Sequence, residues 1–365
     1  MRTVYFITGN LSYGGAPKIL INVANYLSTY YRVKIINFGY NENFYKMNPS
    51  IEFVDTIVER PHNIIKKISN AFFRFIKIYK MVLKDKPAVI IAFDNTEKLF
   101  ATLISKIAST KSIVCERKDP FSYSKGKKNV MYWRYDNADG CIFQTQGAAD
   151  YFSEKTRSHY TVIPNFIEKV NMPSLTWVER NNEIAFVGRF DIPAKRQDIM
   201  LKAFKIVSEQ YPELKLVFYG GGNGIGEDMN AIVNLTKELK LEDKVVFKGV
   251  VSNIQSYLRK SKMFVITSAY EGIPNALLEA MACGLPVVST DCSPGGARFL
   301  INDGFNGKLV PIDDVDAIAS AIELYLKNPD LADQYGKQAR LDMSAYEPEV
   351  ILPRWNEYIE EVINA

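Results

Sequence analysis

One segment, residues 262–291, constrains the fold of this chain more than any other; it reads KMFVITSAYEGIPNALLEAMACGLPVVSTD. Its ends, residues 263–267 and 286–290, are short apolar runs rich in β-branched residues, which is typical of strands buried on both faces. Residues 276–283 between them have the composition of a short helix, with Pro274 near its first turn and Gly284 at its end. Because such crossovers join parallel strands, this segment predicts an α/β fold.

Two glutamates in this segment are candidates for ligand binding. Glu271 follows the first strand, at the edge of the sheet where open α/β folds bind ligands. Glu279 lies eight residues further on, about two helical turns away. The helix start between them offers backbone N–H groups and partial positive charge suited to a phosphate. Each carboxylate could therefore accept hydrogen bonds from a hydroxylated ring, or both could be solvated; the spacing alone leaves both interpretations open.

The wording of this segment resembles that of a known family. EGIPNALLE is similar to the E-x7-E signature of the family-4 retaining glycosyltransferases, which have the GT-B fold of two Rossmann-like domains with parallel sheets facing across a cleft. The resemblance implies that Glu271 meets the hydroxyls of the donor sugar and Glu279 the ribose of the nucleotide. It also places the donor against the loop and helix start formed by Gly272, Ile273, Pro274, Asn275 and Ala276.

The order of strand-like and helical segments predicts two domains. A length of 365 residues is long for one core. Helical stretches alternate with strand-like runs at 3–8, 33–38, 88–93, 112–115, 140–143 and 161–163 in the first half of the chain. We expect an acceptor-binding Rossmann-like domain at 1–170 and a nucleotide-sugar-binding one at 183–345, joined by the polar segment 168–182. Residues 346–365 should form a helix that returns to the first domain, as it does in relatives.

A glycine pair follows the first predicted strand, residues 3–8, and precedes a helix predicted at 17–28. This order puts Gly14 and Gly15 at a sheet edge beside a helix start, where the backbone can approach a phosphate. A tight turn would explain the pair equally well, and the spacing does not fit the dinucleotide pattern G-x-G-x-x-G. The resemblance implies a position near the donor diphosphate and the acceptor.

Two cations follow the strand predicted at 183–187, in the sequence GRFDIPAKRQD. Arg189 and Lys195 could stabilise the charge that develops on a leaving diphosphate, or they could belong to a solvated basic loop. The family has a G-R-x(n)-K pair here, which implies the diphosphate role. Arg196 stands where the family usually has Gly. Further on, Gly249 and Val250 resemble the loop that seats the base of the donor.

The first half departs from the family pattern. Many members keep a His in the first domain, but His62 and His159 do not follow the appropriate strand. The segment VCERKDP, residues 114–120, stands there instead and resembles the S-E-R-N-D-P wording of bacterial members that extend lipid-linked or capsular glycans with hexose or N-acetylhexosamine. Glu116 and Arg117 are therefore expected either to contact the acceptor or to form a partly exposed ion pair with each other.

We expect neither a cofactor nor a metal. Asp314 and Asp316 match a D-x-D metal motif, but they lie where a helix begins, and acidic residues there are explained by capping. The four cysteines, Cys115, Cys141, Cys283 and Cys292, lie in or beside apolar runs without metal-ligand spacing, so we expect buried free thiols in a reducing cytosol.

The charge distribution suggests a membrane partner. Residues 1–175 carry 25 Lys and Arg against 14 Asp and Glu, a net charge of +11, whereas the whole chain carries +4. No run of eighteen apolar residues could span a bilayer. The segment 60–86 has eight basic residues and one acidic residue. Its apolar side chains recur at helical spacing: Ile65, Ile68, Phe72, Phe75, Ile76, Tyr79 and Leu83.

Lysines and an arginine flank this apolar stripe: Lys66, Lys67, Arg74, Lys77, Lys80 and Lys84. The pattern fits a helix lying on an anionic membrane surface, and it also fits a core stripe with a solvated face. A second contact is expected from residues 123–135, with Lys125, Lys127, Lys128 and Trp133. The expected location is the cytoplasm, at the inner face of the cell membrane.

Together these features predict a metal-independent retaining transferase without a nucleic-acid partner. It should move a hexose or N-acetylhexosamine from a UDP-linked sugar to a glycan or polyprenyl-linked acceptor in surface polysaccharide synthesis. The alternatives are a nucleotide-sugar epimerase of the same fold and an inactive partner subunit. The intact set of Glu271, Glu279, Arg189 and Lys195 argues against both.

Overall fold

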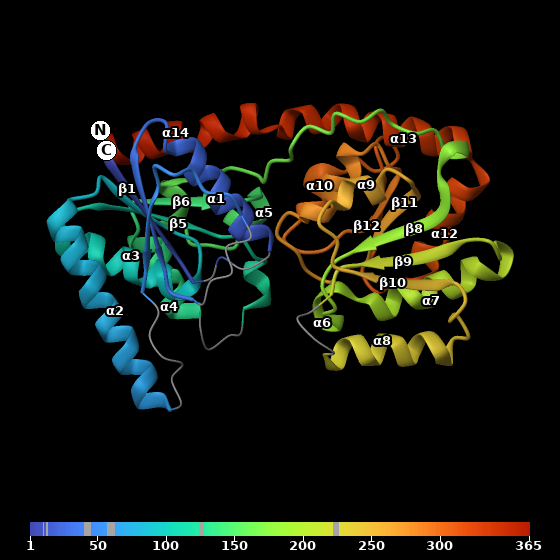
Figure 1. The fold of residues 1–365 in the computed structure, drawn as a ribbon, viewed down its shortest axis with the longest axis horizontal. Coiled ribbons are helices and arrows are strands. Elements are labelled where there is room, and N and C mark those ends of the chain that lie inside the picture. Colours follow the sequence, from blue (N-terminus) through green and yellow to red (C-terminus); the bar gives the residue numbers. More distant parts are fainter. Residues whose placement is uncertain (10, 12–13, 40–44, 57–62, 124–127, 222–225) are drawn as a thin grey trace. The chain divides into compact units, whose positions relative to one another are not determined.

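The computed structural model describes residues 1–365 except 10, 12–13, 40–44, 57–62, 124–127 and 222–225. The chain forms two compact units, one of residues 1–165 with 349–365 and one of residues 166–348 (Figure 1). Each unit is built on a parallel sheet with helices packed against it, which confirms the predicted α/β class.

The first unit has a sheet of seven strands among its described residues, in the order β3-β2-β1-β4-β5-β6-β7. Along the chain these are β1 (Thr3–Thr8), β2 (Arg32–Asn37), β3 (Glu52–Asp55), β4 (Val89–Ala92), β5 (Lys111–Cys115), β6 (Gly140–Phe143) and β7 (Tyr160–Val162). Its helices are α1 (Gly15–Leu27), α2 (Ile64–Asp85), α3 (Asn95–Ala108), α4 (Lys128–Asn137), α5 (Gln146–Asp150) and α14 (Pro348–Asn364). The sequence pattern missed β3, a half-exposed edge strand of four residues with an acidic residue at each end.

The second unit has a six-stranded sheet among its described residues, in the order β10-β9-β8-β11-β12-β13. These strands are β8 (Asn181–Val187), β9 (Lys215–Tyr219), β10 (Val245–Gly249), β11 (Ser261–Ile266), β12 (Val287–Thr290) and β13 (Lys308–Val310). The helices are α6 (Ile192–Lys195), α7 (Gln197–Gln210), α8 (Glu227–Glu238), α9 (Ile254–Leu258), α10 (Asn275–Ala282), α11 (Gly296–Leu300), α12 (Val315–Lys327) and α13 (Pro329–Asp342).

The second sheet is buried on both faces, as its apolar strands predict. In β8, Ile184 and Phe186 pack into one apolar cluster and Ala185 into another. Successive side chains of a strand point to opposite faces, so these two clusters lie on opposite sides of the sheet. Helices cover both faces of the sheet, so residues that could bind a ligand are expected on the loops at the strand ends.

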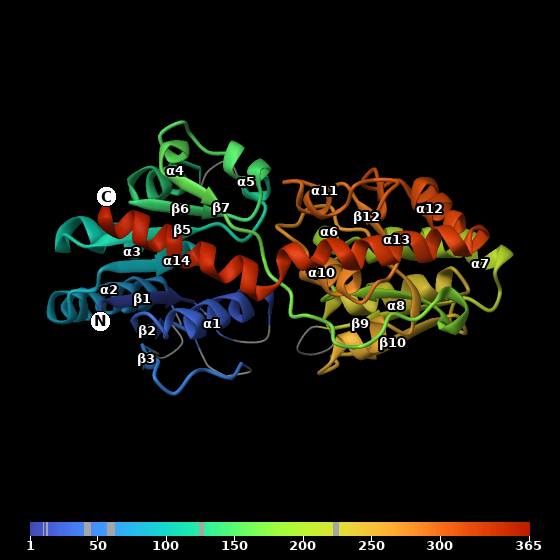
Figure 2. The same ribbon diagram turned by 90° about the horizontal axis from the view of Figure 1, so that it is seen from above.

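The C-terminal helix α14 packs on the first unit and runs across its sheet (Figure 2). The fully buried Trp355 ring stacks on Phe93, with centroids 6.0 Å apart and planes 6° from parallel. The Tyr358 hydroxyl accepts a hydrogen bond from Cys141 N at 2.9 Å and donates one to His159 O at 2.8 Å. These contacts explain why residues 349–365 belong to the first unit.

The boundary between the units lies after Asn165, five residues before the predicted end of the first domain. The segment that follows is not a free linker, because Arg340 donates hydrogen bonds to the carbonyl oxygens of Val170 and Met172 at 2.8 Å each. Cys115, Cys141, Cys283 and Cys292 are buried free thiols, as predicted. None of the described helices is long and apolar enough to cross a membrane.

Candidate functional site

The candidate site lies where the strand order of the second sheet changes direction. Strands β8 and β11 are neighbours at the centre, while β9 lies outside β8 and β12 lies outside β11. The connections after β8 and β11 therefore diverge at their carboxyl ends, and ligands of open α/β sheets bind at such a point. Arg189 and Lys195 follow β8, and Glu271 follows β11, so the structure brings the three predicted residues to this edge.

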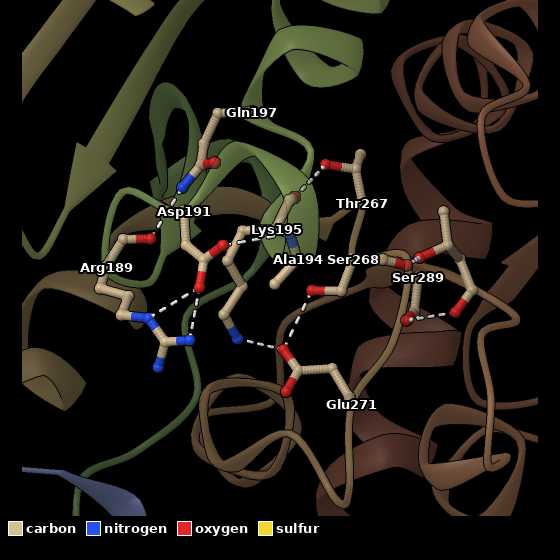
Figure 3. A network of polar contacts seen from close by, with 10 residues as sticks. Arg189, Asp191, Ala194, Lys195, Gln197, Thr267, Ser268, Glu271 and Ser289 are labelled. Atoms are coloured by element: carbon tan, nitrogen blue, oxygen red, sulfur yellow. Dashed lines mark hydrogen bonds and ion pairs between the residues drawn. The ribbon is translucent and has the colours of Figure 1, made fainter. Parts of the chain in front are cut away.

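An ion pair joins the two connections. Lys195 Nζ donates to Glu271 Oε1, and each side chain is only 16% exposed (Figure 3). Ser268 Oγ also donates to Glu271 Oε1, at 2.9 Å. These two donors hold one carboxyl oxygen of Glu271 in place at the sheet edge. The residues lie 76 positions apart in the chain, so only the fold could reveal the contact.

Arg189 is held differently. Its Nε and Nη2 atoms donate to Asp191 Oδ2 at 3.0 and 2.5 Å, and 66% of its side chain remains exposed (Figure 3). Asp191 Oδ1 also accepts from Ala194 N at 3.2 Å and so caps α6, the short helix that ends at Lys195. Asp191 therefore orients both cations. The sequence carried a signal for it, since Asp before Ile-Pro-Ala has the pattern of a helix N-cap.

The residue after Lys195 explains the glycine that the family prefers there. Arg196 has φ 51° and ψ 46°, the left-handed conformation that glycine adopts without strain. Ion pairs from Arg196 to Asp198 and Asp313 compensate for this strain. Thr267 Oγ1 lies 3.0 and 2.8 Å from the carbonyl oxygens of Lys195 and Arg196, which fixes the turn against the end of β11.

The loop after Glu271 packs tightly against the start of α11. Glu271 N donates to Ser293 O at 3.0 Å, and a Cβ on Gly296 would lie 1.6 Å from Gly272 O. Only glycine fits there. Pro274 is the N-cap of α10, and its own side chain makes no capping hydrogen bond. The predicted donor-binding run from Gly272 to Ala276 is therefore a fixed loop leading into a helix start.

Two other predicted donor contacts lie further along the same edge. Glu279 is half-buried in the second turn of α10. Gly249 ends β10 with φ 69°, its carbonyl oxygen accepts from Gly220 N at 2.7 Å, and Val250 beside it is largely exposed. Since β10 is two strands from β8, Val250 lies about 10 Å from the end of β8.

The predicted glycine pair belongs to the first unit. Gly14 precedes α1 and Gly15 is its first residue, so the pair forms a helix start and not only a turn. The Tyr45 hydroxyl accepts from Gly14 N at 3.0 Å and donates to Gly14 O at 2.9 Å. Nearby, Asp94 Oδ2 accepts from Gly9 N at 3.0 Å, and burial followed by the charge of Asp94 raises the pKa of Glu97 to about 7.

The structure corrects both expectations for Glu116. Its side chain is 1% exposed, so it is neither a surface residue nor half of a pair with Arg117. The Oε2 atom accepts from Lys98 Nζ at 3.3 Å and from the Tyr135 hydroxyl at 2.5 Å. The Oε1 atom accepts from the Tyr123 hydroxyl and from two backbone N–H groups of its own loop. Both carboxylate oxygens already accept hydrogen bonds from these partners. Glu116 therefore stabilises the loop, and its buried carboxylate does not face a binding surface.

Arg117 lies between rings of two different elements. Its guanidinium carbon is 5.1 Å from the ring centroids of both Phe93 and Trp355, and Nη1 donates to Asn165 Oδ1 at 3.3 Å. Burial lowers the pKa of Arg117 to about 10. The side chain thus ties β5 to α14 and to the end of the first unit.

Asp314 Oδ1 accepts from Ala317 N at 2.9 Å, which confirms its predicted role as a helix cap.

Comparisons with known proteins match the chain to glycosyltransferases. Residues 168–342 match the family model described as Glycosyl transferases group 1. An uncharacterized glycosyltransferase of Haemophilus influenzae is 28% identical over 365 residues, covering 97% of this chain and 99% of that protein. A Campylobacter jejuni α-1,4-N-acetyl-D-galactosaminyltransferase, whose name specifies a GalNAc glycan on PP-undecaprenol, is 27% identical over 374 residues and covers 100% of both chains.

Solved structures support the fold. Anabaena HepE in complex with UDP-glucose superimposes with a TM-score of 0.80 at 18% identity over 100% of both chains. The lipopolysaccharide outer core galactosyltransferase WaaB gives a TM-score of 0.77 at 18% identity, covering 98% of this chain and 99% of that one. The chain therefore has the GT-B fold. Most of its second unit matches the group 1 glycosyltransferase model, and the relatives named above are glycosyltransferases.

Proposed function

We propose that this protein transfers a hexose or N-acetylhexosamine from a UDP-linked sugar to a glycan or lipid-linked acceptor, with retention at the anomeric carbon. The observation that carries the proposal is the contact between Lys195 and Glu271 at the switch point of the second sheet, with Arg189 beside it. A cation for the diphosphate and a carboxylate for the sugar are thereby held next to each other.

The cations account for leaving-group stabilisation. As the glycosidic bond breaks, negative charge grows on the diphosphate, and fixed cations stabilise that charge more than the ground state. Lys195 is anchored at the end of α6, whereas the exposed Arg189 side chain can turn toward a ligand from its contact with Asp191. The start of α10 adds backbone dipoles. This supply of positive charge supports a reaction without an external metal.

The carboxylate of Glu271 is proposed to accept hydrogen bonds from the hydroxyl groups of the donor sugar. A bound diphosphate competes with Glu271 for Lys195 Nζ and frees carboxylate oxygens for sugar hydroxyls, while Ser268 continues to hold one of them. Glu279, one helical turn inside α10, is proposed to take the ribose, and Gly249 with Val250 the base. The assignment of UDP draws support from HepE, which has the same fold and was solved with UDP-glucose.

The acceptor is assigned to the first unit. The Campylobacter relative, similar over the whole chain, has a name that specifies a PP-undecaprenol glycan. An Erwinia amylovora relative, 23% identical over 367 residues, is named an amylovoran biosynthesis glycosyltransferase. By this similarity we place the protein in the synthesis of a bacterial surface polysaccharide or lipid-linked glycan. The network around Glu116 positions the loop that carries Arg117 at the carboxyl end of β5.

A donor and acceptor screen tests the proposal. UDP release is measured across UDP-hexoses and UDP-N-acetylhexosamines, with and without undecaprenyl diphosphate glycans, and the anomeric configuration of the product is read by NMR. A glycosylated acceptor with retained configuration is expected. Lys195→Ala should lower the rate of its formation by a factor equivalent to about 2–4 kcal/mol, while the matched surface variant Lys202→Ala should not. An epimerised nucleotide sugar, an inverted product or no product with any pair would overturn the proposal.

A further inference from the structure

The first three turns of α2 carry an apolar surface that nothing covers among the described residues. Ile64, Ile65, Ile68, Phe72 and Phe73 are each 62–74% exposed. A monomeric soluble protein rarely gathers so many large apolar side chains on one short stretch of surface. In Figure 1 this end of α2 extends past the other helices of its unit.

The C-terminal part of α2 packs against the first unit. Ile78 and Val82 are buried in the apolar core of the first unit, and Phe75 and Tyr79 pack against that core. The sequence left open whether the apolar stripe of this helix packs in the core. For Phe75 and Tyr79 it does. For Ile65, Ile68 and Phe72 it does not, because they lie in the N-terminal turns of the helix, beyond the reach of the core. The C-terminal part of the helix is therefore held by the core, while its N-terminal turns keep their apolar side chains exposed.

The charges around the exposed face are positive and available. Lys67, Lys80 and Lys84 are exposed on α2. Its single carboxylate, Asp85, accepts from Lys34 Nζ and from the Tyr5 hydroxyl at 2.5 Å each, so its charge is neutralised inside the unit.

Two other cations predicted to flank the apolar stripe, Arg74 and Lys77, form hydrogen bonds within the first unit. Arg74 Nη2 donates to Phe38 O at 2.9 Å, and Lys77 Nζ donates to Asp55 O at 3.3 Å. They hold α2 against the sheet and cannot serve as surface charges at the same time. The predicted contacts at Lys125 and Lys127 lie outside the described residues.

We propose that the first three turns of α2 insert their apolar side chains into the headgroup region of an anionic bilayer, with Lys67, Lys80 and Lys84 on the lipid phosphates. Charge complementarity selects this occupant: a convex ridge of Ile and Phe flanked by lysines matches an apolar layer beneath a negative surface. The inference does not depend on the proposed transfer chemistry, because it concerns a different surface and binding is measured without turnover.

Vesicle co-sedimentation of the full chain tests the proposal. Phosphatidylcholine vesicles with and without phosphatidylglycerol are compared at about 0.01 M salt, where the Debye length is about 30 Å, and at about 1 M, where it is about 3 Å. We expect binding only to the anionic vesicles, weakened at high salt. The triple variant with Glu at 67, 80 and 84 should bind on the order of a hundredfold more weakly, since each lysine near the surface contributes about a fivefold factor.

Matched variants on the second unit separate the helix from overall charge and hydrophobicity. Glu at positions 202, 237 and 240 removes the same charge from exposed lysines elsewhere. Phe72→Ser with Phe73→Ser should lose most of the binding that persists at high salt, whereas Phe305→Ser, at another exposed aromatic, should not. Ile65→Trp adds a direct reporter, whose emission should shift to the blue with anionic vesicles, while Val178→Trp should show no shift.

The proposal is overturned by any of three results. The first is no binding to anionic vesicles at low salt. The second is equal weakening by the variants of α2 and of the second unit. The third is a concentration-dependent dimer that Phe72→Ser abolishes and that leaves vesicle binding unchanged, which would assign the face to a second copy of the chain.

Discussion

Replacing Lys98 with Met should destabilise the first unit by about 3–5 kcal/mol at neutral pH, the usual cost of leaving a buried charge without its partner. Lys98 and Glu116 are each 1% exposed, and their Nζ and Oε2 atoms lie 3.3 Å apart. At that separation and an effective dielectric constant of about 20, the attraction is about 5 kcal/mol. The loss of this attraction sets the upper end of the expected range.

The effect should depend on pH in a defined direction. Burial acts to raise the pKa of Glu116, but the charge of Lys98 and the hydrogen bond from Tyr135 outweigh it and lower that pKa. In the wild type this group therefore contributes stability above its unfolded pKa, which is lost as pH falls through the lower folded value. In Lys98→Met the pKa of Glu116 should rise, so the free energy of unfolding of this variant should fall as pH increases. The stability difference should thus be largest near pH 7–8 and shrink toward about pH 4, near the unfolded pKa.

Urea unfolding measures the difference. Trp133 and Trp355 report on the first unit and Trp177 on the second, so the measurement is made in a Trp177→Phe background. Adding Glu116→Gln to Lys98→Met removes the stranded charge and should restore at least about 1 kcal/mol. Lys205→Met, which breaks the exposed pair with Glu209, is the control and should cost less than about 0.5 kcal/mol.

A loss below about 1 kcal/mol in Lys98→Met, or a loss independent of pH, would refute this reasoning, since a buried unpaired charge must cost more. The same variants decide the role of Glu116 in the reaction. If Glu116→Gln raised the KM for acceptor without lowering the urea midpoint, the carboxylate would contact the acceptor, contrary to the network seen here.

Four further predictions concern the second unit. Arg189→Ala and Lys195→Ala should each lower kcat by a factor equivalent to about 2–4 kcal/mol, measured by steady-state UDP release, and wild-type turnover in either would contradict the diphosphate assignment. Glu279→Ala should weaken UDP binding in calorimetry, whereas Glu271→Ala should spare UDP affinity and lose turnover; equal loss of affinity would reject this division of roles. Arg196→Gly should be more stable than Arg196→Ala by about 1 kcal/mol, because alanine keeps the left-handed strain and glycine does not; a more stable alanine variant would show that φ at this position is not strained. Activity should persist with EDTA, and loss that Mn²⁺ or Mg²⁺ restores would establish a metal requirement.

The sequence alone determined what depends on local chemistry and periodicity. The apolar β-branched runs predicted six of the seven strands in the first sheet, and the predicted helix at 276–283 is α10, Asn275–Ala282, shifted by one residue. Asp314 was predicted as a helix cap from its place before an amphipathic run, and its contact with Ala317 N confirms it. The loop around Glu271 was found because strand, loop and helix follow each other without a break.

Only the tertiary structure decided which distant groups meet. The contact between Lys195 and Glu271 requires β8 and β11 to be neighbours, and the pairing of Glu116 with Lys98 requires α3 to cover β5. For α2 the sequence pattern runs an apolar stripe along the whole helix, and it cannot say how far along the helix the core reaches. The core took Ile78 and Val82 and left Ile65 and Phe72 exposed, because burial depends on the partner surface and not on the polarity of the residue alone.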